Sequence, residues 1–371
     1  MQPSHQFRHH LATLDIVRVA AAAAVVAYHL LHRGAIGGEY LSVTFETGTL
    51  AGLGVRHLYL GVHLFFAVSG FVIMASVDGR GWRDFALARL VRLWPTYALC
   101  VTLTALALAA FGDARFPVDG AGWLANLSFV APLFGHPFMD GVYWSIVVEL
   151  VFYAWVAVAL AAGVLPGRVL AFAGLWLAIA AVNELALDAG WLRDVLATRF
   201  APWFAFGILM HEALRRGTSA PLALLLIGAI ALSMHNVADE QIELATRYGL
   251  PVDVPGTIVV NAGLLLAFLA ALHWRAALRP RPWLVTAGLL TYPLYLLHQN
   301  IGYVALERLA PLIGRGAASF AALAGLGVAA WAITRWFDPP ARRAVRALGS
   351  ALARARPAHR AVEPATQIRT R

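Results

Sequence analysis

The sequence contains no lysine, so all 29 of its basic residues are arginines. It contains one cysteine, Cys100, and a single cysteine excludes both an intramolecular disulfide and a cysteine metal cluster. Charged residues make up only 13% of the chain, against about 25% in soluble globular domains. The formal net charge is +9, but no basic surface with interleaved aromatic residues accompanies it, so nucleic acid is not an expected partner.

Apolar residues take the place of the missing charges. They make up 60% of the 371 residues, the mean hydropathy is +0.69, and the excess extends along the whole chain. A helix needs about 20 mostly apolar residues to cross a bilayer. We therefore predict an all-α, polytopic membrane protein with about ten transmembrane helices. The candidate spans are 14–32, 57–77, 95–111, 142–162, 168–187, 199–214, 220–235, 256–273, 284–305 and 317–336.

The distribution of arginine predicts the orientation. The first residues are polar and lead directly into a long apolar run, without the order of regions that marks a cleaved signal peptide. With ten spans and a cytoplasmic N-terminus, 21 of the 29 arginines fall in the cytoplasmic loops and tails and 8 on the opposite side. Because cytoplasmic loops are enriched in arginine, both termini are expected in the cytoplasm. Residues 1–336 form the expected membrane domain, and the Arg-rich tail 337–371 is expected to lie on the membrane surface or to be disordered.

The first span carries three ionisable residues, Asp15, Arg18 and His29. A helix turns by about 100° per residue, so all three lie on one narrow stripe, and Arg18 and His29 are separated by roughly 16 Å. Ionisable groups inside a membrane are costly and mark functional sites by default. The alternative is that Asp15 and Arg18 form an ion pair at the helix end and that His29 lies at the interface.

The second span contains His63, Ser69 and Gly70 in the stretch GVHLFFAVSGFVI. His63 and Gly70 are seven residues apart and therefore share one helix face. The small residues allow a ligand or a second helix to approach the backbone closely. Binding of a ligand and packing of a helix are both compatible with this pattern.

Arg89 and Arg92 follow the second span at i, i+3 spacing, and Pro95 is expected to begin the next span. Two guanidinium groups on one face suit a phosphate, because arginine is planar, permanently charged and rich in donors. The alternative is the ordinary enrichment of arginine on the cytoplasmic side.

Two further segments place polar residues inside spans. Glu149 follows Ser145 by four residues in WSIVVELVFY, and a carboxylate at that depth is a candidate for function. In TYPLYLLHQ, Tyr295 and His298 lie on adjoining turns and can equally form a structural hydrogen-bond cluster. The histidines lie on separate elements without a recurring ligand spacing, so no metal site is expected.

Five segments occur in a fixed order along the chain: LDIVRVAAAAAVVAYHL, GVHLFFAVSGFVI, RLVRLWPTY, WSIVVELVFY and TYPLYLLHQ. This ordered set resembles the acyltransferase-3 family of bacterial membrane O-acyltransferases, from about residue 11 to 336. The resemblance implies about ten spanning helices in the bacterial cytoplasmic (inner) membrane. It covers the membrane part of that family, without the soluble domain that some members carry.

The resemblance also implies roles for individual residues. His29 matches the family's catalytic histidine, and Arg18 matches its basic partner in the same helix. Arg89 and Arg92 match the arginine motif that is associated with the acyl donor, and Glu149 matches the acid of the tryptophan-serine-glutamate segment. The residues expected to support the site are Asp15, Ser69, Trp144, Ser145, Tyr295 and His298.

His63 departs from the family pattern, because many members have aspartate at this position. We include His63 among the expected catalytic residues, but the partner that orients His29 must then differ. Two possibilities follow from the sequence: His63 hydrogen-bonds His29, or Glu149 takes the orienting role.

The resemblance implies transfer of an acyl group, with acetyl as the expected group, from acyl-CoA to a hydroxyl of a carbohydrate or glycolipid. Acyl-CoA is expected as a substrate and no cofactor as a bound group; membrane lipids surround the protein. Two other classes fit the same residues less well. One is a proton-coupled transporter or flippase for a lipid-linked glycan, since such proteins also use intramembrane His, Glu and Arg. The other is a non-catalytic assembly or sensor protein.

Overall fold

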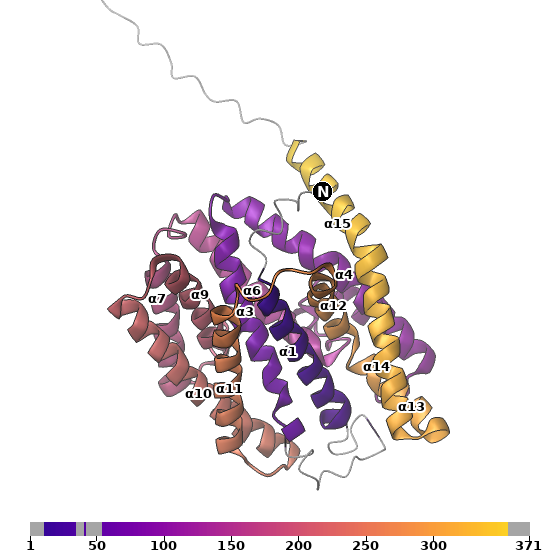
Figure 1. Ribbon diagram of the computed structural model, residues 1–371. Helices are drawn as coiled ribbons and strands as arrows, with labels where there is room; N and C mark the ends of the chain where they lie inside the picture. The colour runs from indigo at the N-terminus through magenta and orange to yellow at the C-terminus, as the bar shows by residue number, and fades with distance from the viewer. Residues whose placement is uncertain (1–10, 35–40, 42–53, 355–371) are drawn as a thin grey trace, which may run out of the picture.

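The computed structural model describes residues 11–34, 41 and 54–354, with side chains described up to residue 349 (Figure 1). Within these ranges the chain forms helices and connecting loops and no strand, which confirms the predicted all-α class. The main helices are α1 (Ala12–Leu31), α3 (Gly61–Val77), α4 (Trp82–Phe111), α6 (Trp144–Ala161), α7 (Val169–Val182), α9 (Ala201–Arg216), α10 (Ala220–Tyr248), α11 (Val254–His273), α12 (Pro282–Leu297), α13 (Asn300–Ile313), α14 (Arg315–Ala332) and α15 (Asp338–Arg354).

Shorter elements connect them. The 3-10 turns are η3 (Leu58–Leu60), η4 (Ala131–Phe134) and η5 (Gly141–Tyr143), the short helices are α5 (Gly120–Asn126) and α8 (Gly190–Leu196), and the π-helical turns are η6 (Asn183–Leu187) and η7 (Ile333–Phe337).

Eight helices in the described part of the chain are long and apolar enough to cross a membrane. The two remaining predicted spans correspond to α9 and α12, which have 16 residues each and are therefore shorter than a full span. The protein is a multi-pass membrane protein, and ten membrane-embedded helices agree with the sequence prediction.

Three predicted boundaries differ from the structure. Helix α4 begins at Trp82, so Pro95 lies inside the helix. The prediction that Pro95 begins this helix is wrong. Helix α10 continues to Tyr248, well past the predicted end at residue 235. The predicted tail begins with α15, which packs against α4, where Thr96 donates a hydrogen bond to Asp338. The later tail, 355–371, lies outside the described residues.

The predicted span 284–305 is divided between α12 and α13 at His298 and Gln299. The backbone N–H of Asn300 donates a hydrogen bond to Asp140 Oδ2, 2.9 Å away, instead of continuing the helix to the fourth preceding carbonyl. The buried Asp140 also accepts from the N–H of Val142 just before α6. A side chain from a distant loop therefore begins α13.

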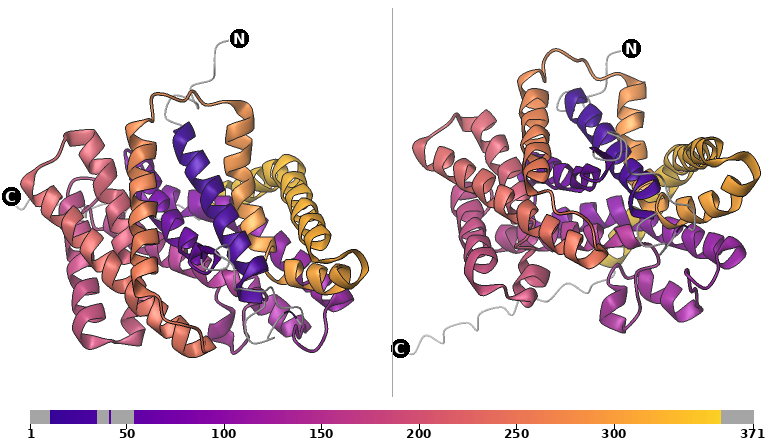
Figure 2. Two further views of the ribbon diagram at one scale, coloured as in Figure 1. Left: turned by 60° about the horizontal axis from the view of Figure 1, so that its bottom comes forward. Right: turned by 90° about the horizontal axis from the view of Figure 1, so that it is seen from below.

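Helix α1 lies at the centre of the molecule, packed against α3, α11 and α12 (Figures 1 and 2). Helices α7, α9 and α10 lie on one side of it, and α13, α14 and α15 lie on the other (Figure 1). Because α1 touches helices from both halves of the chain, its polar stripe faces residues that are distant in sequence.

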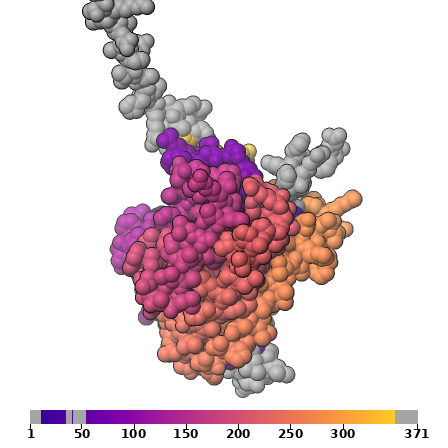
Figure 3. Space-filling model, turned by 90° about the vertical axis from the view of Figure 1, so that its left-hand side faces the viewer, coloured from indigo at the N-terminus to yellow at the C-terminus, as the bar shows by residue number. Residues whose placement is uncertain are grey.

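Helices α7, α10 and α11 form an outer face of the molecule (Figure 3). It exposes large side chains, namely Leu175, Leu224, Ile227, Val259 and Leu266, each at least 63% exposed. An exposed apolar surface of this kind suits contact with lipid.

Helices α3 and α9 cross with their backbones in contact. A Cβ atom at Gly70 would lie 2.1 Å from the carbonyl oxygen of Phe204, and one at Gly207 would lie 2.0 Å from that of Ala67. Small residues permit such an approach in membrane helices. Of the two roles that the sequence left open for Gly70, ligand binding and helix packing, the structure therefore shows helix packing.

Replacing Gly70 by alanine is expected to destabilise the fold by about 1–3 kcal/mol, because the added methyl group would force α3 and α9 apart. The matched control is Gly228→Ala in α10, where a Cβ meets nothing within 4 Å. The check is the melting temperature of the purified proteins in detergent, followed by tryptophan fluorescence. Equal melting temperatures for the two variants would contradict the close crossing.

Candidate active site

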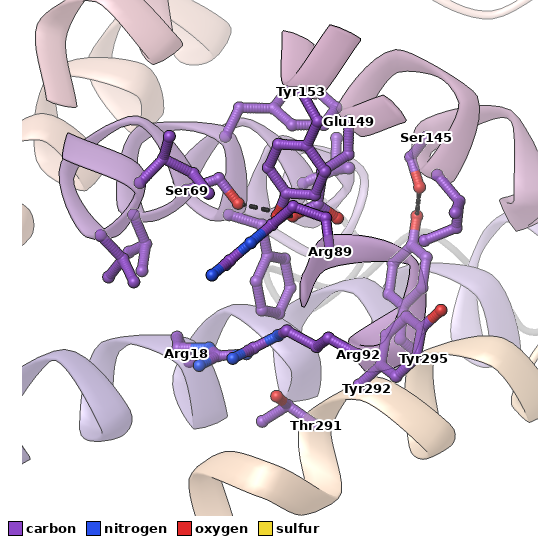
Figure 4. Close-up of a pocket in the computed structure, with 17 residues that line it drawn as sticks. Arg18, Ser69, Arg89, Arg92, Ser145, Glu149, Tyr153, Thr291, Tyr292 and Tyr295 are labelled. Carbon is purple, nitrogen blue, oxygen red and sulfur yellow. Dashed lines mark hydrogen bonds between the residues drawn. The ribbon is translucent and has the colours of Figure 1, made fainter. Parts of the chain in front are cut away.

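A narrow cavity lies among α1, α3, α4, α6 and α12 (Figure 4). Arg18 of α1 and the α4 residues Arg89 and Arg92 extend into it. The cavity has a volume of about 80 Å³. The i, i+3 spacing in α4 puts both of its arginines on one face, and the α1 stripe supplies the third. The structure thus brings the three predicted arginines together.

Glu149 lies in the same narrow cavity. It accepts hydrogen bonds from Ser69 Oγ, 2.8 Å away, and from the hydroxyl of Tyr153 (Figure 4). Ser145, Glu149 and Tyr153 are spaced by four residues, so they share one face of α6. One carboxylate therefore faces three guanidinium groups, and the cavity carries an excess of positive charge.

The guanidinium of Arg89 is held by aromatic rings. Its carbon lies 5.5 Å from the ring centroid of Phe85 and 5.9 Å from that of Tyr153. Its buried Nε has no hydrogen-bond partner among the described residues. An N–H donor left open in this way is available to an anion.

His29 lines a wider cavity, which has a volume of about 460 Å³. This is within the usual range of about 300–1,000 Å³ for ligand pockets. Trp144, the first residue of α6, lines it, and so do Tyr28 and Arg33 beside His29. Of the predicted catalytic residues, only His29 lines this cavity.

Two hydrogen bonds hold the His29 ring. Its Nδ1 lies 2.9 Å from the carbonyl oxygen of Val25 and 3.0 Å from Nε2 of His298. His298 Nδ1 lies 2.7 Å from the carbonyl oxygen of Tyr295. Carbonyl oxygens only accept, so both Nδ1 atoms carry the proton, and the single Nδ1–H of His29 is shared between the Val25 carbonyl oxygen and His298 Nε2 in a three-centre hydrogen bond. His29 Nε2 is then left with a free lone pair, as a general base requires.

The position of His298 depends on the break after α12. His298 is the first residue after α12, and the break is held by Asp140, as described above. Asp140 lies just outside the spanning segments, and its burial raises its pKa to about 7, while the N–H groups of Asn300 and Val142 oppose the rise. A loop carboxyl thus supports the residue that orients the predicted base.

The two cavities share only Val62 and Tyr295 among their lining residues. The Tyr295 hydroxyl lies 2.7 Å from Ser145 Oγ, which in turn donates to the carbonyl oxygen of Val142 (Figure 4). These residues form a thin wall between the arginine cavity and the histidine cavity. Both Ser145 and Tyr295 were predicted to support the site.

His63 does not form the hydrogen bond to His29 that the sequence left open. Its Nε2 lies 3.0 Å from Oε2 of Glu240, and its ring packs 4.2 Å from that of Trp203. Within the described residues, His29 is oriented by His298, and Glu149 is bonded to Ser69 and Tyr153 on the other side of the wall. Both orienting partners considered for His29 were therefore wrong.

Asp15 also lies away from the two cavities. It is buried, and its carboxyl packs against Gly288 of α12, where a Cβ atom would lie within 2.7 Å of the Asp15 carboxyl carbon. The α1 stripe is thus divided along its length: Asp15 faces α12, Arg18 faces the narrow cavity and His29 faces the wide one.

The sequence prediction missed the contribution of α10 to the wide cavity. Glu240, Glu243, Arg247 and Tyr248 line it from the last two turns of that helix. Their spacing of three, four and one residues places them on one side of a helix. This periodicity is visible in the sequence, but the predicted span ends at residue 235 because the residues after it are polar.

A family model described as an acyltransferase domain matches residues 11–336, nearly the whole chain. The chain belongs to the acyltransferase-3 family. It is therefore an acyltransferase enzyme of the membrane, and the transporter and sensor readings fall away. No curated protein and no solved structure matches the chain.

In this acyltransferase, His298→Leu is expected to lower the turnover number about tenfold, because His29 loses one hydrogen-bond acceptor that fixes its tautomer. His298→Gln keeps an acceptor in the side chain and should recover part of the rate. The check is the rate of acyl transfer by both purified variants and the wild type. Equal losses in the two variants, or no loss, would contradict the orienting role.

Proposed function

We propose that the protein transfers an acyl group, most simply acetyl, from acyl-CoA to a hydroxyl group of a carbohydrate or glycolipid. The observation that carries the proposal is the pair of cavities, one lined by three arginines and the other containing His29, with Val62 and Tyr295 between them. Each cavity suits one of the two substrates that an acyl transfer requires.

The arginine cavity suits the donor. Coenzyme A carries phosphate groups, and arginine binds phosphate through charge-assisted, multidentate hydrogen bonds. Arg89 and Arg92 lie in the first half of α4, and Arg18 lies on α1, the helix that also carries His29. The narrow cavity is too small for a whole donor, so the phosphates stay at the arginines while the pantetheine arm displaces the Tyr295 side chain.

The wide cavity suits the acceptor. His29 Nε2 removes the hydroxyl proton as the oxygen attacks the thioester carbonyl, and general-base catalysis of this kind contributes about 10²–10⁴-fold. Tyr295, which lines both cavities, can donate to the oxyanion of the tetrahedral intermediate. When the intermediate collapses, the C–S bond breaks and the protonated His29 returns the proton to the departing thiolate, which restores the free base.

The orientation follows from charge. The described start of α1, the start of α4 and the end of α15 lie toward the same side of the molecule (Figure 1), and the predicted cytoplasmic loops hold most of the arginines. The arginine cavity then opens toward cytoplasmic acyl-CoA in the bacterial inner membrane. His29 lies toward the other side, so the acceptor is extracytoplasmic or lipid-linked, as in exopolysaccharide or lipopolysaccharide biosynthesis.

The deciding experiment uses purified protein in lipid, acetyl-labelled acetyl-CoA and a membrane glycan extract. The wild type is expected to label glycan, and His29→Ala is expected to abolish labelling while the protein remains folded. Labelling by His29→Ala at the wild-type rate would remove His29 from the chemistry. Absence of labelling by folded wild type, with donors of several chain lengths and several glycan extracts, would count against the proposed substrates.

The donor site makes a separate prediction. Arg89→Lys and Arg92→Lys are each expected to raise KM for acetyl-CoA about tenfold, because lysine keeps the charge but loses the planar, multidentate contact. Arg83→Lys is the matched control, since Arg83 lies in the first turn of α4, is exposed and stacks on Trp82. A KM for acetyl-CoA that stays at the control value would show that the arginine pair serves membrane topology only.

A further inference from the structure

Glu240 has an unusual position in the wall of the wide cavity. It comes from α10 and lines the cavity that contains His29, and its side chain is 13% exposed. On its other side lies His63 of α3, whose Nε2 is 3.0 Å from Glu240 Oε2. The distance is that of an ion pair, but neither atom is aligned for a hydrogen bond. The carboxylate therefore has accepting capacity left over.

The neighbouring acid shows the contrast. Glu243, one turn further along α10, is bound by Arg199 at 2.6 Å and by Arg247 at 2.9 Å, which engages both of its oxygens. No arginine contacts Glu240 among the described residues, although three arginines line the same cavity. The two acids thus differ: both oxygens of Glu243 are bound by arginines, whereas Glu240 lines the cavity with no arginine bound to it among the described residues.

His63 is built to fix the position of Glu240. It is fully buried, with its ring packed 4.2 Å from Trp203, 5.7 Å from Phe200 and 6.4 Å from Tyr59. Aromatic side chains surround the imidazole on several sides, so it has little freedom to turn. Its Nε2 lies 3.0 Å from the Glu240 carboxylate, so the fixed ring limits where that carboxylate can lie.

We infer that Glu240 binds the acceptor through hydroxyl groups beside the one that is acylated, and that His63 is the residue that positions it. A carboxylate only accepts hydrogen bonds and offers about four lone-pair sites, whereas each hydroxyl of a sugar can donate one. His29 and Glu240 line one cavity, so an acceptor can present its reacting hydroxyl to His29 and a second hydroxyl to Glu240. The inference rests on the proposed function and narrows the acceptor to polyhydroxylated molecules, such as glycosides with at least two free hydroxyl groups.

A purely structural ion pair predicts something different. If Glu240 served only as a structural partner of His63, its loss would lower stability, because a buried polar side chain would lose that partner. The acceptor would not bind more weakly to the fraction of protein that is folded. The apparent KM for the acceptor, measured on folded protein, therefore separates the two roles.

The test compares wild type, Glu240→Gln and Asp239→Asn in lipid, with labelled acetyl-CoA. The membrane glycan extract is the acceptor, and its concentration is varied and expressed as hexose content. Glu240→Gln is expected to raise the KM for acceptor about tenfold to a hundredfold, because hydrogen bonds to a charged acceptor are lost. Hydrolysis of acetyl-CoA by water, measured as CoA release in the absence of acceptor, should stay at the wild-type rate. Asp239, which precedes Glu240, is about half exposed and does not line the cavity, so Asp239→Asn should change neither quantity.

His63 is tested in the same assay. His63→Leu should raise the KM for acceptor, and His63→Gln, which keeps an N–H donor toward Glu240, should recover part of the affinity. A merely structural histidine would lower the melting temperature of both variants without this difference in KM between them.

Three results would overturn the inference. An unchanged KM for acceptor in Glu240→Gln would remove Glu240 from acceptor binding. An equal loss of acceptor-independent CoA release would show a general defect of the site. Failure of the wild type to label any glycan would overturn the proposed function itself, and only that outcome would remove both.

Discussion

The interruption between α12 and α13 is the constraint on which the site depends. A buried backbone N–H must find a hydrogen-bond partner, so a helix inside the protein can break only where another group takes over. Asp140 does so by binding the N–H of Asn300, and the break leaves His298 beside His29. A loop before α6, the end of α12 and the central helix α1 thus cooperate to give one imidazole a defined tautomer, and the same loop places Trp144 and Ser145 at the start of α6.

A second principle is the separation of unlike chemistries along α1. The helix presents Arg18 to one cavity and His29 to the other, three turns apart, while Asp15 is used for packing against α12. In the proposed reaction the arginines of the narrow cavity bind phosphate, whereas His29 accepts a proton. Arginines line the wide cavity as well, but Glu243 pairs with two of them, Arg199 and Arg247, whereas Glu149 is the only carboxylate that lines the narrow cavity among the described residues.

Much of this could be read from the sequence. Hydropathy located the helices, and helical spacing placed Arg89 with Arg92 and Ser145 with Glu149, because these relations are local. The partners of His29, His63 and Glu149 could not be deduced in the same way, since they depend on the rotation and depth of helices that pack from distant parts of the chain. His298 required knowledge of a helix break caused by Asp140, and Glu240 required recognising that α10 continues beyond its apolar part.

The thin wall between the cavities has a consequence for the membrane as a barrier. A transporter must move its whole cargo, and it alternates between large open states to do so. Here Val62 and Tyr295 separate the two cavities, and in the proposed reaction the acyl group passes them at the end of the pantetheine arm. The nucleotide and the acceptor each stay on their own side in this proposal, so the transfer requires no continuous aqueous path. The proposed reaction therefore exchanges a thioester on one side for an ester on the other, and a chemical group crosses the barrier while neither substrate does.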